Sequence, residues 1–600
     1  MLELNQSNFN KEIQDNKMLV VDFWAEWCTE VNAEILIEDN IPKLAKEIKN
    51  SDNLLTYNGK EIISDKVKKS FTSNMLGHCK EIITESGRKI KVTDEHEFLT
   101  PKGWKQAQEL RENDKVAVMP HYNKINSIKE NYEILKERDI ISIAYKFRDL
   151  EIYIKELQEK NLLPLRLNNK NILIITRLIG SLYTDGNIYK TKDSNRHQIS
   201  FSLGTKKDVN TLIKDLEKLG FFKFNLKKRK NRIEINNRTF YISTYVLKVY
   251  STSLAIFFKA LGAPVGDKTS TNYELPKWLI NTKSKEIKRE FLAAFIGGDG
   301  PKIIMTISKR EKKEPYNTLK INDIEFHKNP EQVESGIKIA TQLSKLFKEL
   351  DIKIDKIFVE DDNYVKKDGN KSKIIHIKIR NNFENAFNLY ANVGYKYSHT
   401  KNIESMQSTE FIRRILTKRQ NWIVKYNEPI KLNKEKGYGY RKLSNILNLH
   451  PSTIWKWVKK GVKPTVNYHK LKFPKWLKEN TKGLPEELLW EEIKECKEIY
   501  LESVQKISME NNHNFIANGF LAHNCGPCKA VSPIFEELSK EMKDVRFAKL
   551  NVDDNQDLAQ RLGVMGIPTF IIFKDGKEVG RTTGAAPKSV IKLKIEAALK

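Results

Sequence analysis

The sequence has few cysteines and no long apolar run. Five cysteines in 600 residues are too few for a disulfide-stabilised secreted domain, and they suit a reducing compartment. The longest apolar stretch, around Ile172–Tyr183, is interrupted by Arg177 and is too short to span a bilayer. The first residues lack the basic start and apolar core of a signal peptide. We therefore expect a cytoplasmic protein that does not bind a membrane.

Positive charge is concentrated in the interior of the chain. The 105 Lys and Arg outnumber the 77 Asp and Glu, which gives a net charge of +28. Residues 1–27 and 525–600 together carry 15 basic and 15 acidic residues, so residues 28–524 hold the whole excess. Such a field favours a polyanion, most simply nucleic acid, although a solvated lysine-rich surface has the same composition. A chain of 600 residues is also too long for a single hydrophobic core, which predicts several domains.

The two flanks, residues 1–27 and 525–600, read as one interrupted domain of 103 residues. When Trp27 is joined to Cys525, the sequence becomes FWAEWCGPCK. A Cys-x-x-Cys pair that opens a helix supplies a nucleophilic thiol, because the helix N-terminus lowers the thiol pKa. Strand and helix patterns alternate, as in an α/β sheet. Strands are expected over Met18–Ala25, Val545–Asp553, Thr569–Phe573 and Lys577–Val579, and helices over Ser532–Met542 and Pro587–Ala598.

The joined flanks resemble thioredoxin. The resemblance implies dithiol–disulfide exchange through Cys525 and Cys528, without a cofactor. It also implies a buried acid at Asp22 with Lys549 near it, and a cis proline, Pro568, that faces the redox pair. The partners that it implies are thioredoxin reductase and disulfide-bearing proteins.

The start of residues 28–524 carries groups that can rearrange a peptide bond. Cys28 can attack the carbonyl of Trp27 and convert that amide into a thioester. The shift is uphill unless the amide is positioned and its nitrogen is protonated. A Thr-x-x-His pair, Thr93 and His96, suits both tasks.

The end of the same segment carries the complementary groups. Cys525 can take the acyl group from Cys28 by thiol–thioester exchange. Asn524 can cyclise onto its own carbonyl and cut the Asn524–Cys525 bond, with His523 placed to assist. A final shift from sulfur to nitrogen would leave Trp27 and Cys525 joined by an ordinary peptide bond.

These stretches resemble the motifs of inteins. Cys28–Asp39 is similar to the first motif, Gly87–Phe98 to the second and Glu510–Cys525 to the last two, in which His513 matches a second C-terminal histidine. The sequence departs from the family at Lys506, where many inteins carry an aspartate that coordinates the first two steps.

The intein resemblance implies an all-β splicing domain, made of residues 28–150 and 490–524, that needs no cofactor.

Two further segments, Leu178–Gly186 and Leu292–Gly300, suggest a second enzyme inside the insert. Each reads as a short apolar helix with small residues inside it and Asp-Gly at its end. Small residues allow two helices to approach closely, and glycine ends a helix. Asp185 and Asp299 would then meet at paired helix ends and hold Mg²⁺ beside a phosphate.

The two segments resemble the LAGLIDADG motif of homing endonucleases, at four and five of nine positions. The resemblance implies an α+β nuclease domain over residues 165–420 that cuts double-stranded DNA at the intein-less host gene. It also implies a metal site at Asp185 and Asp299, and a catalytic lysine at Lys268.

Basic and helical patterns suggest further contacts with DNA. Lys227, Lys228 and Arg229 belong to a basic run that can contact phosphates or form a solvated turn. Residues 430–480 resemble a helix-turn-helix reader, whose second helix would enter a major groove. The alternative is a helical linker with an aromatic packing face. The groove-facing residues would be Ser452, Thr453 and Lys456.

The sequence therefore predicts a multidomain precursor. An α/β thioredoxin fold is split by an all-β splicing domain, an α+β endonuclease domain and a small helical region. Splicing, DNA cleavage and disulfide exchange are the expected activities. Two alternatives stay open: a nuclease that has decayed to DNA binding only, and a DNA-binding protein that carries a thioredoxin-like module and never splices.

Overall fold

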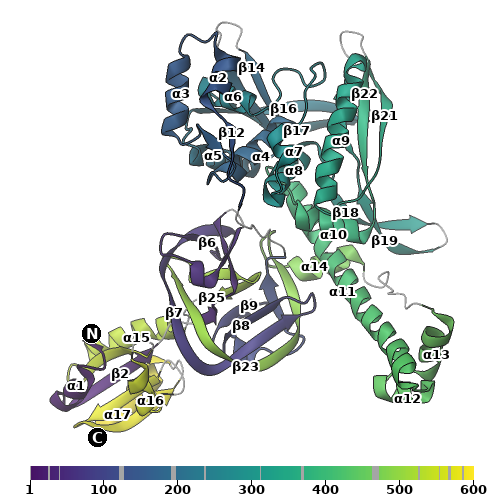
Figure 1. Ribbon diagram of the computed structural model, residues 1–600. Coiled ribbons are helices and arrows are strands. Elements are labelled where there is room, and N and C mark those ends of the chain that lie inside the picture. Colours follow the sequence, from purple (N-terminus) through teal and green to yellow (C-terminus); the bar gives the residue numbers. More distant parts are fainter. Residues whose placement is uncertain are drawn as a thin grey trace. The chain divides into compact units, whose positions relative to one another are not determined.

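The computed structural model divides the chain into two compact units, residues 1–122 with 479–600 and residues 123–478 (Figure 1). No helix in the described part of the chain is long and apolar enough to cross a membrane. The structure describes residues 2–24, 28–38, 41–120, 128–190, 197–235, 238–310, 313–365, 371–462, 472–523, 527–552, 555–564, 569–583 and 587–599.

The flanking residues form a five-stranded mixed sheet with helices. Its elements are β1 (Leu2–Leu4), α1 (Phe9–Asp15), β2 (Met18–Trp24), α15 (Pro527–Glu541), β26 (Arg546–Asn551), α16 (Gln556–Arg561), β27 (Thr569–Lys574), β28 (Lys577–Thr583) and α17 (Lys588–Leu599). The strand order is β1-β26-β2-β27-β28. β1 and β2 run parallel to β26, whereas β27 is antiparallel to β2. The expected strands and helices are confirmed, with ends that differ by up to five residues.

The core of this sheet follows the alternation of side chains along β2. Met18 and Val20 pack in one apolar cluster, while Leu19, Val21 and Phe23 pack in another. Successive side chains of a strand point to opposite faces. A continuous apolar run therefore predicts a central strand that is covered on both faces.

The two ends of the insert build a second, twelve-stranded sheet. Its elements are β3 (Cys28–Glu30), β4 (Glu34–Ile37), β5 (Ile41–Leu44), η2 (Ala45–Glu47), β6 (Asn53–Tyr57), β7 (Ile62–Thr84), β8 (Lys89–Thr93), β9 (Glu97–Thr100), β10 (Gly103–Gln106), η3 (Ala107–Glu109), β11 (Lys115–Val118), β23 (Leu489–Met509), β24 (Asn514–Ala517) and β25 (Phe520–His523). β24 pairs with both β4 and β25, so the strand path closes on itself. The long antiparallel pairing of β7 with β23 joins segments more than 400 residues apart.

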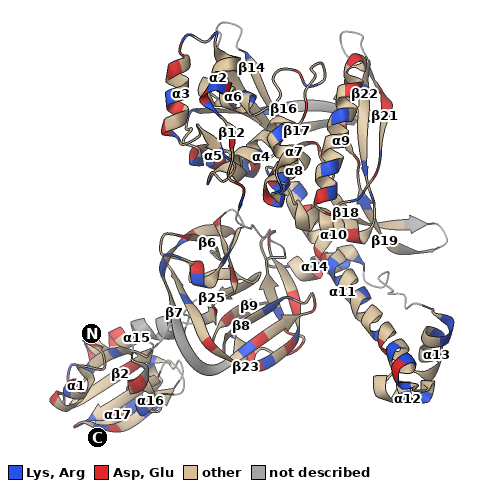
Figure 2. Cartoon of the chain, in the orientation of Figure 1, with Lys and Arg blue, Asp and Glu red and all other residues tan. Residues whose placement is uncertain are grey.

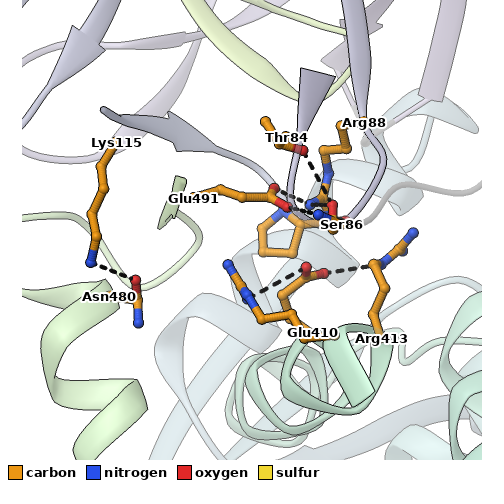
Figure 3. A network of polar contacts seen from close by, with 10 residues as sticks. Thr84, Ser86, Arg88, Lys115, Glu410, Arg413, Asn480 and Glu491 are labelled. Atoms are coloured by element: carbon orange, nitrogen blue, oxygen red, sulfur yellow. Dashed lines mark hydrogen bonds and ion pairs between the residues drawn. The ribbon is translucent and has the colours of Figure 1, made fainter. Parts of the chain in front are cut away.

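A buried ion pair ties the two segments of this sheet together (Figure 3). Arg88 donates to Glu491 and to the carbonyl of Pro120, while the Ser86 amide donates to Glu491 at 2.9 Å. The side chains of Arg88 and Glu491 are 8% and 0% exposed. Removing one partner would leave a buried charge and destabilise the domain by about 3–5 kcal/mol.

The second unit contains an αββαββ segment (residues 172–249), a related segment with one more strand (residues 285–379), and a helical extension. Its elements are β12 (Glu133–Leu135), α2 (Glu137–Ala144), α3 (Leu150–Glu159), β13 (Leu165–Arg166), α4 (Ile172–Leu182), β14 (Gly186–Lys190), β15 (His197–Leu203), α5 (Lys206–Lys218), β16 (Phe224–Ile235), β17 (Arg238–Val249), α6 (Thr252–Ala260), α7 (Lys277–Asn281), α8 (Lys285–Asp299), β18 (Ile303–Arg310), β19 (Lys313–Ile321), β20 (Ile324–Lys328), η4 (Pro330–Gln332), α9 (Val333–Glu349), β21 (Ile354–Val365), β22 (Lys371–Ile379), α10 (Phe383–Asn392), α11 (His399–Lys436), α12 (Tyr440–Leu447), α13 (Pro451–Lys460) and α14 (Phe473–Thr481). The splicing-domain segment was expected to reach residue 150, but its sheet ends at β11. α2 and α3 pack on α6 of this second unit.

The two halves of this unit share most of their sheet. The first half has the order β14-β15-β17-β16, and the order β20-β22-β21 repeats its last three strands with the same antiparallel pairing. β18, the strand after the second motif, instead pairs with β19. Its backbone amides at Ile303 and Met305 donate to the hydroxyls of Ser405 and Ser408 on α11, at 3.1 and 3.2 Å.

The predicted helix-turn-helix is present as α12 and α13. Trp457 of α13 packs against Trp422 and Tyr426 of α11, with ring centroids 6.0 and 5.7 Å apart. The aromatic packing face that was the alternative interpretation therefore also exists, and it orients α13 against the long helix.

Candidate functional sites

The predicted splicing residues that the structure describes lie in one part of the twelve-stranded sheet. Thr93 ends β8, and its carbonyl accepts the His96 amide at 3.1 Å. The His96 ring lies 6.4 Å from the Phe515 ring on β24. Just before β24, the His513 ring lies 6.4 Å from the His523 ring on β25. Groups from both ends of the insert are thus brought together.

The polar side chains of the Thr93–His96 turn are shielded from solvent. The Thr93 and His96 side chains are buried. The Thr93 hydroxyl has no hydrogen-bond partner within the described ranges. An unsatisfied buried hydroxyl costs about 1–3 kcal/mol, so this oxygen is available to a further polar group.

The loop that carries His513 is fixed by hydrogen bonds from the N-terminal segment. Asp65 accepts the amides of Asn511 and Asn512 at 3.0 and 2.6 Å. The Asn514 side chain accepts from the Tyr57 amide and donates to the Tyr57 carbonyl, at 2.6 and 2.8 Å. These contacts hold His513 at the start of β24.

The residue opposite Cys28 is a buried lysine. β3 begins at Cys28, whose backbone pairs in register with Lys506 of β23. Lys506 is 1% exposed, and its Nζ lies 5.5 Å from the centroid of the Phe71 ring. Lysine is almost never fully buried unless it is partnered. The lysine that departs from the family pattern is therefore an internal residue and not a surface substitution.

Asp22, the buried acid that the thioredoxin resemblance implies, lies in the core of the flanking sheet. Asp22 of β2 is opposite Lys549 of β26 in the register. Burial raises the pKa of Asp22 to about 7, although the Lys549 ammonium acts in the opposite direction. Cys528 lies in the first turn of α15.

Some of the predicted residues lie outside the described residues, namely Trp27, Asn524, Cys525 and Pro568. The side chains of Cys28 and Cys528 also lie outside them.

In the second unit, α4 and α8 approach each other through small residues. A Cβ added at Gly180 would lie 2.4 Å from the Phe291 carbonyl oxygen, and one at Gly298 would lie 2.3 Å from the Thr184 hydroxyl. Only glycine fits these positions without displacement. The close approach that the sequence predicts is therefore present.

The prediction that an Asp-Gly glycine ends each helix is wrong for Gly186, because α4 ends at Leu182, but Gly300 is the C-cap residue of α8. Gly186 is the first residue of β14, and Gly300 has an extended conformation with φ −86°. Neither has the positive φ of a glycine helix cap. Glycine is required at both positions because there is no room for a side chain. A Cβ at Gly186 would lie 2.9 Å from Leu182, and one at Gly300 would lie 2.2 Å from Ile296.

Asp185 and Asp299 are coupled electrostatically at this helix crossing. Asp185 lies in the turn after α4, and Asp299 is the last residue of α8. Burial, followed by the charge of Asp299, raises the pKa of Asp185 to about 6. Although Asp299 is exposed, partial dehydration of its carboxyl group also raises its pKa, whereas Lys268 and Lys401 act against the shift in both aspartates.

Two lysines cap the helix ends in the same way. Lys268 Nζ donates to the carbonyls of residues 182, 184 and 186, at 3.3 and 2.8 Å for the first and last. Lys401 Nζ donates to the carbonyls of residues 296, 298 and 300, at 3.3 and 3.0 Å for the first and last. Burial lowers the pKa of Lys268 to about 8 and also lowers that of Lys401, while the two aspartates oppose both shifts. Sequence reasoning missed Lys401, because no motif surrounds it at the start of α11.

The predicted DNA contacts lie on exposed elements. Lys227, Lys228 and Arg229 are exposed on β16, and Ser452 and Lys456 are exposed on α13, where Thr453 is half-buried. α12 and α13 carry five Lys or Arg and no Asp or Glu (Figure 2). The Ser452 hydroxyl is 2.8 Å from His450 Nδ1 at the helix start.

Comparison with known proteins identifies two families. The model of the intein splicing domain matches residues 32–524, and the thioredoxin model matches residues 1–61 and 496–597. The chain belongs to the intein family. Its intein splicing domain interrupts a thioredoxin domain.

Individual relatives divide in the same way. The intein-containing chain is 29% identical over 463 residues to the DNA-directed RNA polymerase subunit Rpo1N of Methanocaldococcus jannaschii, covering 75% of this chain and 30% of that one. It is 30% identical over 508 residues to the tRNA-splicing ligase RtcB of the same organism, covering 82% and 49%. Thioredoxin of Chlamydia caviae is 46% identical over 96 residues, or 15% of this chain and 94% of the relative. The chain thus spans half or less of the two archaeal relatives.

Proposed function

We propose that residues 28–524 excise themselves by protein splicing, which joins Trp27 to Cys525 and restores the redox segment of a thioredoxin. The observation that carries this proposal is the convergence of Thr93, His96, His513 and His523 from opposite ends of the insert. The two archaeal relatives, an RNA polymerase subunit and a tRNA-splicing ligase, have unrelated names but match this chain over similar lengths. A mobile insert common to all three chains explains that pattern.

The described groups support the two cleavage steps separately. At the first junction, the available Thr93 hydroxyl would position the amide, and His96 would protonate its nitrogen as Cys28 forms the thioester. At the second junction, His523 would assist the cyclisation of Asn524.

The masses of the products test the splicing proposal. Purified full chain should yield polypeptides of 497 and 103 residues, and Asn524→Ala should prevent release of the 497-residue product. An unchanged product pattern in Asn524→Ala would contradict the mechanism. The joined product should reduce a disulfide substrate, whereas the unspliced Cys28→Ala chain should not.

We further propose that the excised insert is a site-specific endonuclease. The observation that carries this proposal is the repeated arrangement of a carboxylate and a carbonyl-capping lysine at the ends of α4 and α8. Exposed basic residues on β16 and α13 would contact the DNA backbone and groove.

The residues at this crossing fit a divalent cation. Asp185 is half-buried and Asp299 is exposed. Their negative charges repel one another, and a cation would relieve that repulsion. Within the described ranges no cluster of three or more His, Cys, Asp or Glu is arranged as a metal site. A pair of carboxylates suits Mg²⁺, which usually keeps several waters. Bound there, Mg²⁺ would neutralise charge on a scissile phosphate, beside fixed positive charge from Lys268 and Lys401.

Cleavage of the uninterrupted host sequence tests the nuclease proposal. The substrate is a duplex in which the codons of Trp27 and Cys525 are adjacent, and the control duplex contains the insert. We expect cleavage of the first duplex only, and only with Mg²⁺. Binding without cleavage under all divalent-ion conditions would indicate a decayed nuclease.

A further inference from the structure

The carboxyl group of Glu97 lies beside the imidazole of His523. Glu97 begins β9 and His523 ends β25, and these strands pair with Phe98 opposite Ala522. Glu97 Oε2 is 3.7 Å from His523 Nδ1, and each side chain is 18% exposed. The Trp104 ring lies against the imidazole, with centroids 4.7 Å apart. A partly dehydrated acid–imidazole pair therefore immediately precedes Asn524.

Two other titratable groups face this pair. The His513 ring is 6.4 Å from the His523 ring, and Glu109 of η3 lies near Glu97. Burial, followed by the negative charge of Glu109, raises the pKa of Glu97 to about 7. Glu97 therefore changes charge near neutral pH.

We propose that Glu97 is a positioning residue for cleavage of the Asn524–Cys525 bond. The negative charge of its carboxylate, 3.7 Å from Nδ1, would favour the tautomer of His523 that carries the proton on Nδ1, so that Nε2 serves the reacting amide. The inference rests on the proposed cyclisation of Asn524. It concerns a residue outside the Thr-x-x-His pair that the sequence singles out.

The chemistry of cyclisation explains why such a carboxylate helps. Asn524 Nδ2 bonds to its own carbonyl carbon, while the bond from that carbon to the Cys525 nitrogen breaks. One proton leaves Nδ2, and one proton arrives at the Cys525 nitrogen. An imidazole can accept the first and donate the second at Nε2, and a carboxylate at Nδ1 holds the ring in the tautomer that does so.

A role in stability alone does not account for the position of Glu97. The 3.7 Å separation exceeds a hydrogen-bond length, and partly exposed ion pairs contribute about 0–1 kcal/mol. Replacing Glu97 by Gln should therefore leave the sheet folded. Its effect on cleavage can then be measured in the complete chain.

The test uses the Cys28→Ala precursor, in which only the second junction can be cut. Release of residues 525–600 is followed by mass spectrometry from pH 5.5 to 8.5. Because the carboxylate is the active form and its pKa is raised, the rate should fall as the pH drops through about 7. Glu97→Gln should lower the rate at pH 7.5 about 10-fold and move this fall to lower pH, because it removes the group whose pKa is about 7. Glu97→Asp should keep the pH dependence and most of the rate.

Glu109→Gln is the matched control. It keeps an oxygen that can accept the Gln106 amide, as Glu109 does at 3.2 Å, but it removes a charge that raises the Glu97 pKa. Its rate at high pH should stay within about two-fold, while the fall moves to lower pH.

Three results would overturn the inference. In the first, the parent precursor cleaves, but Glu97→Gln has the same rate and pH profile. In the second, Glu97→Gln and Glu97→Asp lose rate equally with an unmoved profile and a lowered melting temperature, which indicates a structural role. In the third, the parent releases no 525–600 fragment at any pH, so that the proposed cyclisation itself fails.

Discussion

The two halves of residues 123–478 place the same groups around their aspartates, but the elements that carry these groups differ. The carbonyls capped by Lys268 and those capped by Lys401 are 114 residues apart, as are Asp185 and Asp299. However, Lys268 lies in a loop, whereas Lys401 lies in the first turn of α11.

The difference between the halves extends to the sheet. β14 belongs to the sheet of the first half, whereas β18 does not pair with the sheet of the second half. Two backbone amides of β18 instead donate to serine hydroxyls of α11. The geometry at the carboxylates is thus kept while the surrounding sheet varies. The lysine hydrogen bonds at the helix ends depend on three particular backbone carbonyls in each half. The amides of a strand edge can be satisfied by any nearby acceptor.

The largest effect should come from removing either carboxylate. Asp185→Asn or Asp299→Asn should each reduce DNA cleavage by about 10³-fold or more, because each would remove a ligand of the cation. Cleavage of the host duplex measures the effect. Asp361→Asn, at an exposed ion pair, is the control. A substantially active variant would show that the two halves do not contribute equally.

The same pair predicts a pH dependence for Mg²⁺ binding. Asp185 has a raised pKa of about 6, and only its charged form is a ligand. Binding should therefore weaken as the pH falls through about 6, as measured by calorimetry on the purified insert. Equal affinity at pH 5.5 and 7.5 would contradict a site at Asp185.

Substitutions in the helix crossing test its symmetry. Gly180→Ala and Gly298→Ala should each destabilise the second unit by about 1–3 kcal/mol, because each Cβ would overlap the facing helix or turn. Calorimetric unfolding of the Cys28→Ala, Asn524→Ala precursor measures this effect. Gly204→Ala is the control, since the nearest atom to its Cβ is 3.8 Å away. A loss at only one of the two glycines would show that the crossing is asymmetric.

Substitution of the two lysines tests whether Lys268, in a loop, and Lys401, on a helix, contribute equally to DNA cleavage. Lys268→Met and Lys401→Met should each lower cleavage by about 10- to 100-fold, because each removes fixed positive charge from the site. Their effects should agree within about three-fold, with DNA binding measured in parallel. If one lysine proves dispensable, the repeated carbonyl capping is structural in that half.

The smallest effect should come from the extension that follows only the second half. Lys456→Ala on α13 should weaken DNA binding a few-fold and reduce its salt dependence by about one counterion. Titrations at several salt concentrations measure both quantities. Lys434→Ala, exposed on α11, is the control. An unchanged salt slope in Lys456→Ala would remove α13 from the proposed interface.

The interruption of the flanks could be predicted because each half keeps its local pattern. Met18–Trp24 is apolar except for Asp22, so its place as a central strand follows from composition alone. The Thr93–His96 spacing likewise predicts one turn. Lys401 and Glu97 were beyond prediction, because each acts on groups that are distant in sequence. The burial of Lys506 depends on β23 pairing with β3 and β7, a register that no local signal specifies.

The sequence by itself determined the family, the host domain and the order of the reactive groups, because these reside in short motifs and in alternating apolar patterns. The tertiary structure alone decided which distant groups meet. It brought Glu97 to His523, Lys506 to the position opposite Cys28, and Lys401 to the end of α8. The physical reason is that strand pairing and helix crossing are set by the packing of whole elements, so contacts between distant residues leave no periodic trace in the chain.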